Sequence, residues 1–328
     1  MQAITQHRYG PPDVLRLDEV DRPVPADDEV LVRVRAAAVN ARDWHVMRGD
    51  PYLARLMPGV MGPRRPKALI RGTDFAGVVE AVGRRVTRLR PGDAVYGEAD
   101  GAFAEYVCAP EAVVDHKPAN LDFEQSAALP LAANTALMGL RDQGRVRAGQ
   151  RVLVNGASGG VGTFAVQFGK WLGAEVTAVC SARNVDLVAS LGADHVIDYA
   201  LDDFTRDEGR YHVVLDLVGN RSLTELRRTL VTGGRLVLSG GGVSTGGSLV
   251  GPMGLIVRAT LSGLVVRRHR LSVLEARPSA ENLVTLRELA EAGAVVPVID
   301  RTYRLAEVPD AIRYVEDEHP RAKVVITV

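Results

Sequence analysis

The stretch RVLVNGASGGVGTFAVQFGKWLG, residues 151–173, decides the fold of this chain. An apolar run, residues 151–155, leads into a glycine-rich turn, and a helical pattern follows directly. Ala157, Gly159 and Gly162 occupy the three small-residue positions of the pattern G-x-G-x-x-G, with alanine in the first. A second apolar run, residues 174–180, comes next. This order of strand, turn, helix and strand predicts a dinucleotide-binding βαβ unit.

Two of these glycines have separate physical roles in such a unit. Gly159 lets the backbone approach a pyrophosphate, and Gly162 lets the helix pack closely on the strand. The phosphates then lie at the positive end of the helix. A tight turn without a ligand is the alternative. The predicted cofactor-binding residues of this loop and of a later strand are Gly156, Ala157, Ser158, Gly159, Gly160, Val161 and Val218.

The end of the second strand indicates which nicotinamide nucleotide binds. An NAD site carries Asp or Glu there to accept from the ribose 2′-OH. This chain reads VCSARN instead, and its first carboxylate is Asp186. Ser181 can donate to a 2′-phosphate and Arg183 can form a fork to it. NADP(H) is therefore predicted, with Tyr199 as a further contact to the adenine or the phosphate. A solvated Arg183 is the alternative.

The rest of the chain is organised around this unit. Residues before about 120 form short Val-rich runs separated by Gly and Pro, which predicts a β-rich part. Strand and helix patterns then alternate, as expected for a parallel sheet. The terminal run KVVITV is expected to join an earlier sheet. We predict an α/β protein with a β-rich domain over 1–122 and 295–328, and a Rossmann-type doubly wound domain over 123–294.

Composition restricts the possible partners and location. Forty basic and forty acidic residues give a formal net charge of zero, which disfavours nucleic acid as a partner. The beginning of the chain lacks a signal-peptide pattern, and the apolar region 251–266 is too short and too charged to span a bilayer. A cytoplasmic location is expected. The segment 254–266 is either a dimer contact or an internal helix.

The chain resembles the medium-chain dehydrogenase/reductase superfamily in six segments that follow one another in the family's order. They are VRVRAAAVNARDWHVMRGD, RGTDFAGVVEAVG, PGDAVYG, GAFAEYV, LPLAANTALMGL and GASGGVG. The resemblance covers essentially the whole chain and is strongest to the zinc-independent quinone oxidoreductases, the zeta-crystallin-like branch. It implies a GroES-like β-rich catalytic domain, NADPH as cofactor, quinones or activated alkenes as acceptors, and a homodimer.

The resemblance also locates the positions that hold zinc in the alcohol dehydrogenases of this superfamily. They correspond here to Asn40, Thr73 and Leu131, and the four-cysteine structural lobe is absent. With none of the Cys or His ligands in place, no metal site is predicted. Zinc normally lowers the pKa of an alcohol. Reduction of an electrophilic quinone or enone needs less of this assistance.

The same resemblance implies the residues around the acceptor and the nicotinamide. Asn40 can donate to a developing oxyanion, and His45, where the family often has Tyr, can position the acceptor or relay a proton. Structural roles are the alternative for both. The remaining implied residues are Tyr52 at the mouth of the site, Thr135 and Gly240 against the nicotinamide, and Arg321 and Lys323 near the 2′-phosphate, where solvated side chains are equally expected.

The preferred hypothesis is an NADPH-dependent, metal-free reductase of quinones or α,β-unsaturated carbonyls, in which His45 or water supplies the proton. A zinc-free NADP(H)-dependent alcohol or ketone dehydrogenase is the second hypothesis. A non-catalytic NADPH-binding sensor or crystallin-like structural protein is the third.

Overall fold

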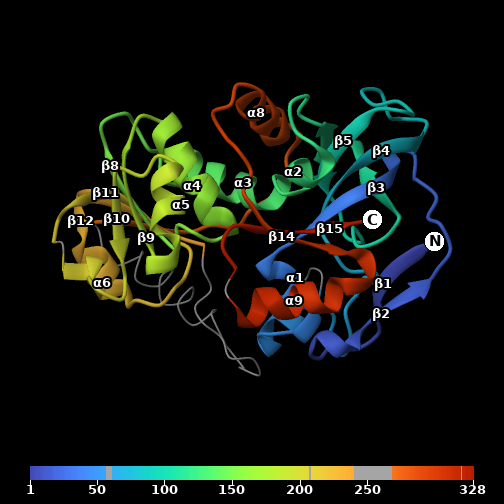
Figure 1. Cartoon of the computed structure of the whole chain (residues 1–328), viewed down its shortest axis with the longest axis horizontal. Coiled ribbons are helices and arrows are strands. Elements are labelled where there is room, and N and C mark those ends of the chain that lie inside the picture. The colour runs from blue at the N-terminus through green and yellow to red at the C-terminus, as the bar shows by residue number, and fades with distance from the viewer. Residues whose placement is uncertain (57–60, 207, 240–267, 319) are drawn as a thin grey trace. The chain divides into compact units, whose positions relative to one another are not determined.

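The computed structural model describes the chain except for residues 57–60, 207, 240–267 and 319. Its internal contacts divide the chain into two units (Figure 1). Unit 1 comprises Met1–Asn134 and Arg277–Val328, and unit 2 comprises Thr135–Ala276. The C-terminal segment, from Arg277 to Val328, therefore belongs to the same unit as the beginning of the chain.

Unit 1 is built around a mixed sheet with the strand order β14-β15-β3-β4-β5-β7, to which β6 adds by pairing with β3. A separate β1-β2 hairpin accompanies it. The strands are β1 (Gln2–Gln6), β2 (Leu15–Glu19), β3 (Glu29–Val39), β4 (Asp74–Val82), β5 (Ala94–Glu98), β6 (Tyr106–Pro110), β7 (Val114–His116), β14 (Ile299–Arg304) and β15 (Lys323–Thr327).

Short helices flank this sheet. They are α1 (Ala41–Arg48), α2 (Phe123–Ala127), α8 (Ala280–Glu291) and α9 (Val308–Asp317), together with the single turns η1 (Pro12–Val14), η2 (Tyr52–Leu56), η3 (Glu111–Val113) and η7 (Leu305–Glu307). Helices α1 and α9 lie side by side in Figure 1, and an Arg48–Glu316 ion pair joins them. Helix α3 (Pro130–Leu137) begins at a proline, and it crosses the boundary between the units.

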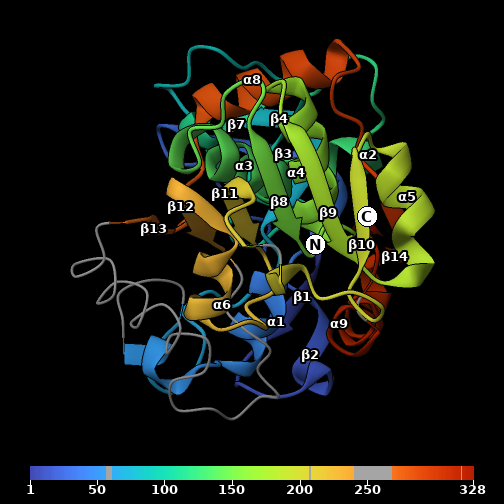
Figure 2. The same cartoon turned by 90° about the vertical axis from the view of Figure 1, so that its left-hand side faces the viewer.

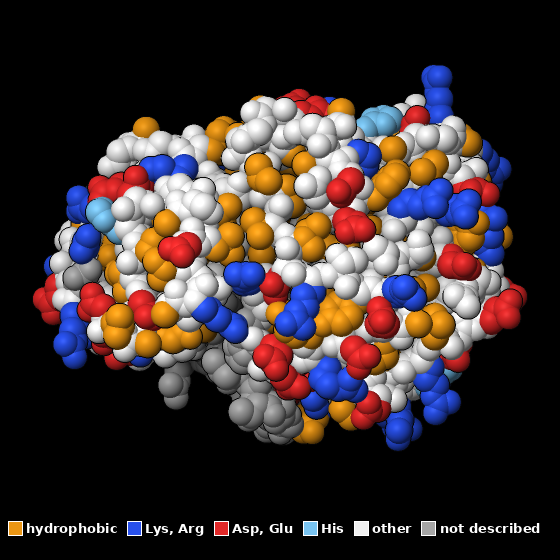
Figure 3. All heavy atoms as spheres, viewed as in Figure 1, with side chains coloured by type: hydrophobic (Ala, Val, Ile, Leu, Met, Phe, Trp, Pro, Cys, Tyr) orange, Lys and Arg blue, Asp and Glu red, His pale blue; other side chains and the backbone are white. Residues whose placement is uncertain are grey.

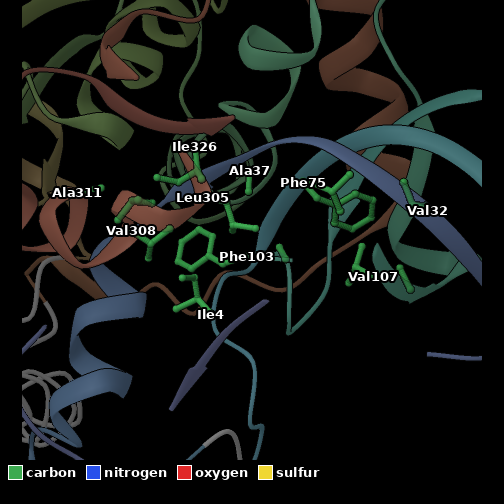
Figure 4. Close-up of a cluster of buried hydrophobic side chains, with 14 of the residues drawn as sticks. Ile4, Val32, Ala37, Phe75, Phe103, Val107, Leu305, Val308, Ala311 and Ile326 are labelled. Carbon is green, nitrogen blue, oxygen red and sulfur yellow. The ribbon is translucent and has the colours of Figure 1, made fainter. Parts of the chain in front are cut away.

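The core of unit 1 joins residues from both ends of the chain. Ile4 and Phe103 pack near Leu305 and Val308, while Phe75 lies closer to Val32 of β3 (Figure 4). All these side chains are less than a tenth exposed. Burial of each large apolar side chain contributes roughly 1.5–3 kcal/mol, so the C-terminal segment is an integral part of the unit.

Unit 2 contains one parallel sheet with the order β10-β9-β8-β11-β12-β13. Numbered within the unit, this order is 3-2-1-4-5-6, that of a Rossmann sheet. Figure 2 shows β11, β8, β9 and β10 in succession, with α5 next to β10. The elements are β8 (Arg151–Asn155), α4 (Gly160–Trp171), β9 (Glu175–Cys180), α5 (Val185–Ser190), β10 (His195–Asp198), β11 (Tyr211–Asp216), α6 (Leu223–Arg228), β12 (Leu230–Leu238) and β13 (Arg270–Val273), with the turns η5 (Ala182–Asn184) and η6 (Phe204–Arg206) and the π-helical turn η4 (Met138–Gln143).

The units divide at other residues than the predicted boundaries, 122/123 and 294/295. Residues 123–134 and 277–294, assigned to the Rossmann domain from the sequence, have their contacts in unit 1. Helix α8 packs on β7, and the Tyr96 hydroxyl donates to the Leu283 carbonyl at 2.6 Å. Arg287 pairs with Asp115 at 2.9 Å. An amphipathic pattern in the sequence predicts a helix, but it does not predict which unit that helix packs on.

Side chains of both charges appear on the surface that Figure 3 displays. Lys and Arg side chains are interspersed there with Asp and Glu, in keeping with the formal net charge of zero. Among the described residues, no helix is both long enough and apolar enough to cross a membrane.

Candidate active site

The glycine-rich turn of unit 2 has the backbone geometry that close ligand approach requires. Gly156 has φ +86°, a left-handed conformation that favours glycine. A Cβ at Gly162 would lie 2.1 Å from the Gly156 carbonyl oxygen, so α4 packs directly on the turn. A Cβ at Gly159 would meet only that same oxygen, at 3.6 Å. Gly162 is therefore required by packing, whereas Gly159 leaves room for a ligand.

The N-terminus of α4 supplies the donors of this turn. The helix begins at Gly160, so the amide groups of Gly160, Val161 and Gly162 have no carbonyl acceptor within the helix. Ala157 is buried, while Ser158 and Gly159 are partly exposed. Such a cluster of amides at a helix N-terminus fits a pyrophosphate. The turn would hold the phosphates of a dinucleotide.

The neighbouring strand end closes the other side of the turn. Val218 lies against Gly156, because a Cβ on that glycine would be 2.7 Å from Val218 Cγ2. Asp216 organises this loop by accepting from Asn155 Nδ2 at 2.8 Å and from the amides of Val218 and Gly219 at 3.2 and 3.1 Å. Asn155 and Asp216 end β8 and β11, the strands on either side of the point where the sheet reverses order. Val218 is predicted from the sequence, whereas Asn155 and Asp216 are not.

The predicted 2′-phosphate residues lie at the end of β9. Ser181 precedes η5, and Arg183 is exposed within it. Tyr199 is 53% exposed, and its amide donates to the Cys180 carbonyl at 3.2 Å, which brings it beside the same strand end. The structure thus gathers Ser181, Arg183 and Tyr199 at one edge of the sheet.

Asn184 connects this strand end to the glycine-rich turn, and sequence reasoning did not find it. Its Nδ2 donates to Ser158 Oγ at 3.0 Å and to Ser181 Oγ at 3.2 Å. The side chain is buried, and its Oδ1 has no hydrogen-bond partner within the described part of the chain. Asn184 therefore fixes the two serines relative to each other.

The acceptor residues implied for unit 1 centre on Asn40, which precedes α1. Asn40 Nδ2 donates to Asp74 Oδ2 at 3.0 Å and weakly to the Ala38 carbonyl at 3.4 Å, and its Oδ1 accepts from Lys323 Nζ at 2.6 Å. Asn40 is 6% exposed. Its amide is engaged on both sides, so in this structure its hydrogens are not directed at a ligand.

Buried carboxyl groups surround Asn40. Asp43 accepts from the Asn40 backbone amide at 2.8 Å, and burial raises the pKa of Asp43 to about 6. Glu98 lies opposite Asp74 on the paired strand β5, and burial with the nearby Asp74 charge raises the pKa of Glu98 to about 8. Burial also raises the pKa of Asp74, against the opposing effect of Lys323. Glu98 is therefore predominantly protonated at pH 7.

Thr73 and Leu131 complete the positions that correspond to zinc ligands. Thr73 Oγ1 is 3.4 Å from Asp43 Oδ1, and the Leu131 amide donates to Asp74 Oδ1 at 3.2 Å. No group of three or more His, Cys, Asp or Glu side chains in the described ranges has the arrangement of a metal site. Leucine offers no ligand atom, and the amide of Asn40 is engaged by its two neighbours.

His45 and Tyr52 lie farther along the same segment. The His45 ring stacks on Trp44 with centroids 3.8 Å apart, and burial lowers the pKa of His45, so the ring is neutral at pH 7. Its buried Nδ1 has no hydrogen-bond partner among the described residues. Tyr52 is 42% exposed under the guanidinium of Arg55. Both positions remain candidates for contact with an acceptor.

The other implied residues have varied outcomes. Thr135 is buried on α3, and Gly240 lies outside the described residues. Arg321 is 57% exposed and pairs with Asp300 at 3.3 Å. Lys323 is only 2% exposed, so the expectation of a solvated side chain is wrong. Its Nζ contacts Asn40, Asp74 and the Val39 carbonyl instead of facing solvent.

Comparisons with known proteins agree with this architecture. Residues 26–119 match the family model described as alcohol dehydrogenase GroES-like domain, and residues 191–326 match the one described as zinc-binding dehydrogenase. The chain is 35% identical to mouse NAD(P)H oxidoreductase RTN4IP1, mitochondrial, over 100% of this chain and 89% of that protein. It is 32% identical to the NADPH-dependent alkenal/one oxidoreductase, chloroplastic, of Arabidopsis thaliana, over 99% of this chain and 79% of that protein.

A solved structure shows the same fold along the whole chain. The quinone oxidoreductase from Coxiella burnetii superposes with a TM-score of 0.84 at 31% identity, covering 100% of this chain and 99% of that one. The GroES-like and Rossmann-type architecture expected from the sequence is confirmed. The chain therefore belongs to the medium-chain dehydrogenase/reductase superfamily, in the branch that contains the quinone oxidoreductases.

Proposed function

We propose that this protein is an NADPH-dependent, metal-free reductase of quinones or α,β-unsaturated carbonyls. The similarity to proteins named quinone oxidoreductase and alkenal/one oxidoreductase supports this acceptor class. The observation that carries the proposal is which residues stand at the positions that correspond to zinc ligands. Asn40 and Leu131 are hydrogen-bonded to Asp74 there, which supports chemistry without a Lewis-acid metal.

NADPH, rather than NADH, is the proposed cofactor. When bound, the dihydronicotinamide supplies a hydride. Ser181 and Arg183 would bind the 2′-phosphate, and the turn with Gly159 would bind the pyrophosphate. The absence of a carboxylate at the end of β9 and the Asn184 bridge between Ser158 and Ser181 support this assignment.

Residues of unit 1 would orient the acceptor and exclude water. His45 is neutral at pH 7, so it can hold an acceptor oxygen through a ring N–H. To act as the proton donor it would first have to take up a proton from water; otherwise water supplies the proton directly. Tyr52, which is partly exposed, would line the entrance. Thr135, the first residue of unit 2, would contact the nicotinamide.

The assembly and the location are also proposals. A homodimer is proposed, although the segment 254–266 expected to build its contact lies outside the described residues. A cytoplasmic location is proposed too, while the compared relatives carry the names of other compartments. Nucleic acid is not proposed as a partner, because the chain has a formal net charge of zero.

Steady-state oxidation of NADPH tests the proposed function. The purified protein is assayed with a quinone, an enone and the saturated ketone of the same carbon skeleton. Turnover of the quinone or enone at a kcat/KM at least tenfold above the ketone is expected. Turnover of the ketone alone would favour the alcohol or ketone dehydrogenase, and tight NADPH binding without any turnover would favour a sensor.

A further inference from the structure

Residues 51–73 carry five basic side chains and no acidic one. The basic residues are Arg55, Arg64, Arg65, Lys67 and Arg71. All forty acidic residues of the chain therefore lie outside this stretch, and the formal net charge of zero conceals a local excess of positive charge. A surface built from this stretch can attract an anionic partner although the whole protein is neutral.

The turn η2 at the start of this stretch is anchored on one side. Side chains three residues apart eclipse each other in a 3-10 turn, and Tyr52 and Arg55 form such a pair. The Arg55 guanidinium lies 4.4 Å from the Tyr52 ring centroid and 4.3 Å from that of Tyr9. Arg55 Nε also donates to the Gly49 carbonyl at 2.7 Å. This side of the turn is therefore fixed to the body of unit 1.

Another side of η2 presents two leucines to solvent. Leu53 and Leu56 are again three residues apart, so they project together from the turn. They are 44% and 75% exposed. Because the contacts of Arg55 hold the turn in place, the two leucines form a fixed apolar projection.

Tyr9 also connects this turn with the cations that follow it in the sequence. Its hydroxyl donates to the Gly62 carbonyl at 2.7 Å and accepts from the Gly62 amide at 2.9 Å. A Cβ on Gly62 would lie 2.6 Å from the Arg65 carbonyl oxygen and 3.6 Å from Lys67 Cγ, so residues 62–67 are folded closely on themselves. Arg64, Arg65 and Lys67 therefore lie in the same region of unit 1 as η2.

These three cations have no acidic neighbour. Arg64, Arg65 and Lys67 are exposed, and none forms an ion pair with a carboxylate in the described part of the chain. Together with Leu53 and Leu56 they make up what we call the leucine–cation surface. A single exposed leucine is ordinary, but two projecting leucines beside three unpaired cations indicate a binding surface.

Lipid chemistry matches both kinds of side chain. At the boundary between the headgroups and the acyl chains of an anionic bilayer, leucine enters the apolar phase while Lys and Arg stay beside the phosphates. A nucleic acid or a polyacidic peptide would pair with the cations but leave the leucines in water. Bases in particular stack on aromatic side chains, whereas the two projecting residues are aliphatic. The leucine–cation surface therefore favours a bilayer over a polyanion.

We propose that the leucine–cation surface docks this protein on anionic lipid bilayers. Leu53 and Leu56 enter the bilayer at the headgroup boundary, and Arg64, Arg65 and Lys67 lie against the lipid phosphates. The attachment is peripheral and reversible, since few apolar side chains enter the lipid. It goes beyond the proposed function and depends on neither its cofactor nor its acceptor.

Sedimentation with phospholipid vesicles tests the proposal. The whole chain, without cofactor or acceptor, is mixed with vesicles of phosphatidylcholine alone or of phosphatidylcholine with phosphatidylglycerol. We expect binding to the anionic vesicles to be stronger by about tenfold or more, and this preference to disappear at high salt. The measurement involves no turnover, so its failure and a failure of the NADPH oxidation assay are distinguishable.

Removal of two cations tests the electrostatic part. Each cation near an anionic membrane strengthens binding about fivefold, so Arg64→Ser/Arg65→Ser should weaken binding to anionic vesicles roughly 30-fold. The matched control is Arg84→Ser/Arg85→Ser, which removes two other consecutive, exposed arginines of unit 1. Both of these lie within ion-pair distance of Asp27. The control changes the net charge equally and should leave the affinity within about threefold.

Removal of the apolar projection tests the hydrophobic part. Leu53→Ser/Leu56→Ser should weaken binding to the anionic vesicles about tenfold or more, because two side chains no longer enter the apolar phase. Its control is Val24→Ser/Leu201→Ser, which replaces two apolar side chains that are each 87% exposed elsewhere. All four positions are exposed, so urea unfolding of both variants should match wild type.

The possible results decide the proposal. It would be overturned if wild type did not sediment with anionic vesicles, or if the controls weakened binding as much as the test variants. Wild-type affinity of Leu53→Ser/Leu56→Ser would overturn it too, since binding would then depend on charge alone. Tighter binding to an RNA oligonucleotide than to the vesicles, lost in Arg64→Ser/Arg65→Ser, would identify a polyanion site in place of a bilayer site.

Discussion

Replacing two glycines of the same turn by alanine should separate ligand binding from packing. Gly159 has φ −80° and ψ 176°, which any L-residue adopts, and its added Cβ would lie 3.6 Å from the Gly156 oxygen. Gly159→Ala is therefore expected to change the free energy of unfolding by less than about 1 kcal/mol. The methyl group would occupy the space through which a pyrophosphate reaches the amides of α4.

Loss of one hydrogen bond to a charged group costs about 1.5–3 kcal/mol, so the NADPH Kd of Gly159→Ala should rise about 10- to 100-fold.

Gly162→Ala should instead lower the free energy of unfolding. Its Cβ would lie 2.1 Å from the Gly156 oxygen and 2.6 Å from the Ala157 carbonyl carbon, both backbone atoms. Overpacking of this kind costs roughly 1–3 kcal/mol, even after the gain in helix propensity.

Fluorescence titration with NADPH and urea unfolding of both variants measure the two quantities. Each variant is the control for the other, since both add one methyl group to the same turn. A folded Gly159→Ala protein that binds NADPH with wild-type affinity would refute the placement of the pyrophosphate. A Gly162→Ala protein of wild-type stability would refute the close packing of α4 on the turn.

Three further substitutions test the cofactor site and the buried carboxyl groups. Arg183→Ala should raise the Kd of NADPH at least tenfold and leave that of NADH unchanged, and an equal loss for both nucleotides in titrations would contradict a 2′-phosphate contact. Asn184→Ala removes the hydrogen bond that positions Ser181 and should weaken NADPH binding several-fold, with about 1–2 kcal/mol lost in urea unfolding; unchanged affinity would show that the bridge is only structural. Burial raises the pKa of Glu98 from its ordinary 4.5 to about 8, so the folded state of wild type loses stability as pH rises through this range. Glu98→Gln should lose that pH dependence and be roughly 5 kcal/mol more stable than wild type above pH 8; parallel stability curves from pH 5 to 9 would disprove the shift.

Local signals accounted for unit 2. The apolar run before Gly156, the small residues after it and the strand ending at Cys180 predicted the βαβ unit, and the structure has β8, α4 and β9 at those places. These features depend on neighbours within about thirty residues. Strand order in the rest of the sheet follows from the same repeated unit, because right-handed crossovers leave few arrangements.

The contact between Lys323 and Asn40 could not be found this way. Lys323 and Asn40 are 283 residues apart, and their contact depends on the register between the last strand and β3. The residue type also led to a wrong prediction. Lysine is ordinarily a surface residue, so Lys323 was expected to be solvated or to lie at a phosphate. A signal was present in the terminal run KVVITV, which indicated pairing with an earlier sheet but did not specify the partner strand or its register.

Asn184 was missed for a different reason. It follows Arg183 in a turn where asparagine is common, so its side chain had an ordinary local explanation. The structure instead directs its amide to Ser158 and Ser181, which belong to different loops of the sheet edge. Such bridges depend on how two loops approach each other, and this is not encoded in either loop alone.

The most direct test of metal-free hydride transfer to a conjugated acceptor is the position of a deuterium label. Chelator-treated protein is supplied with NADPH carrying deuterium on both C4 positions and with an enone, and the product is examined by NMR. We predict deuterium at the β-carbon of a saturated ketone. The rate with this deuterated cofactor should be the same for chelator-treated and untreated protein. Deuterium on the carbinol carbon of an alcohol, or a rate that returns only when zinc is added, would contradict the account.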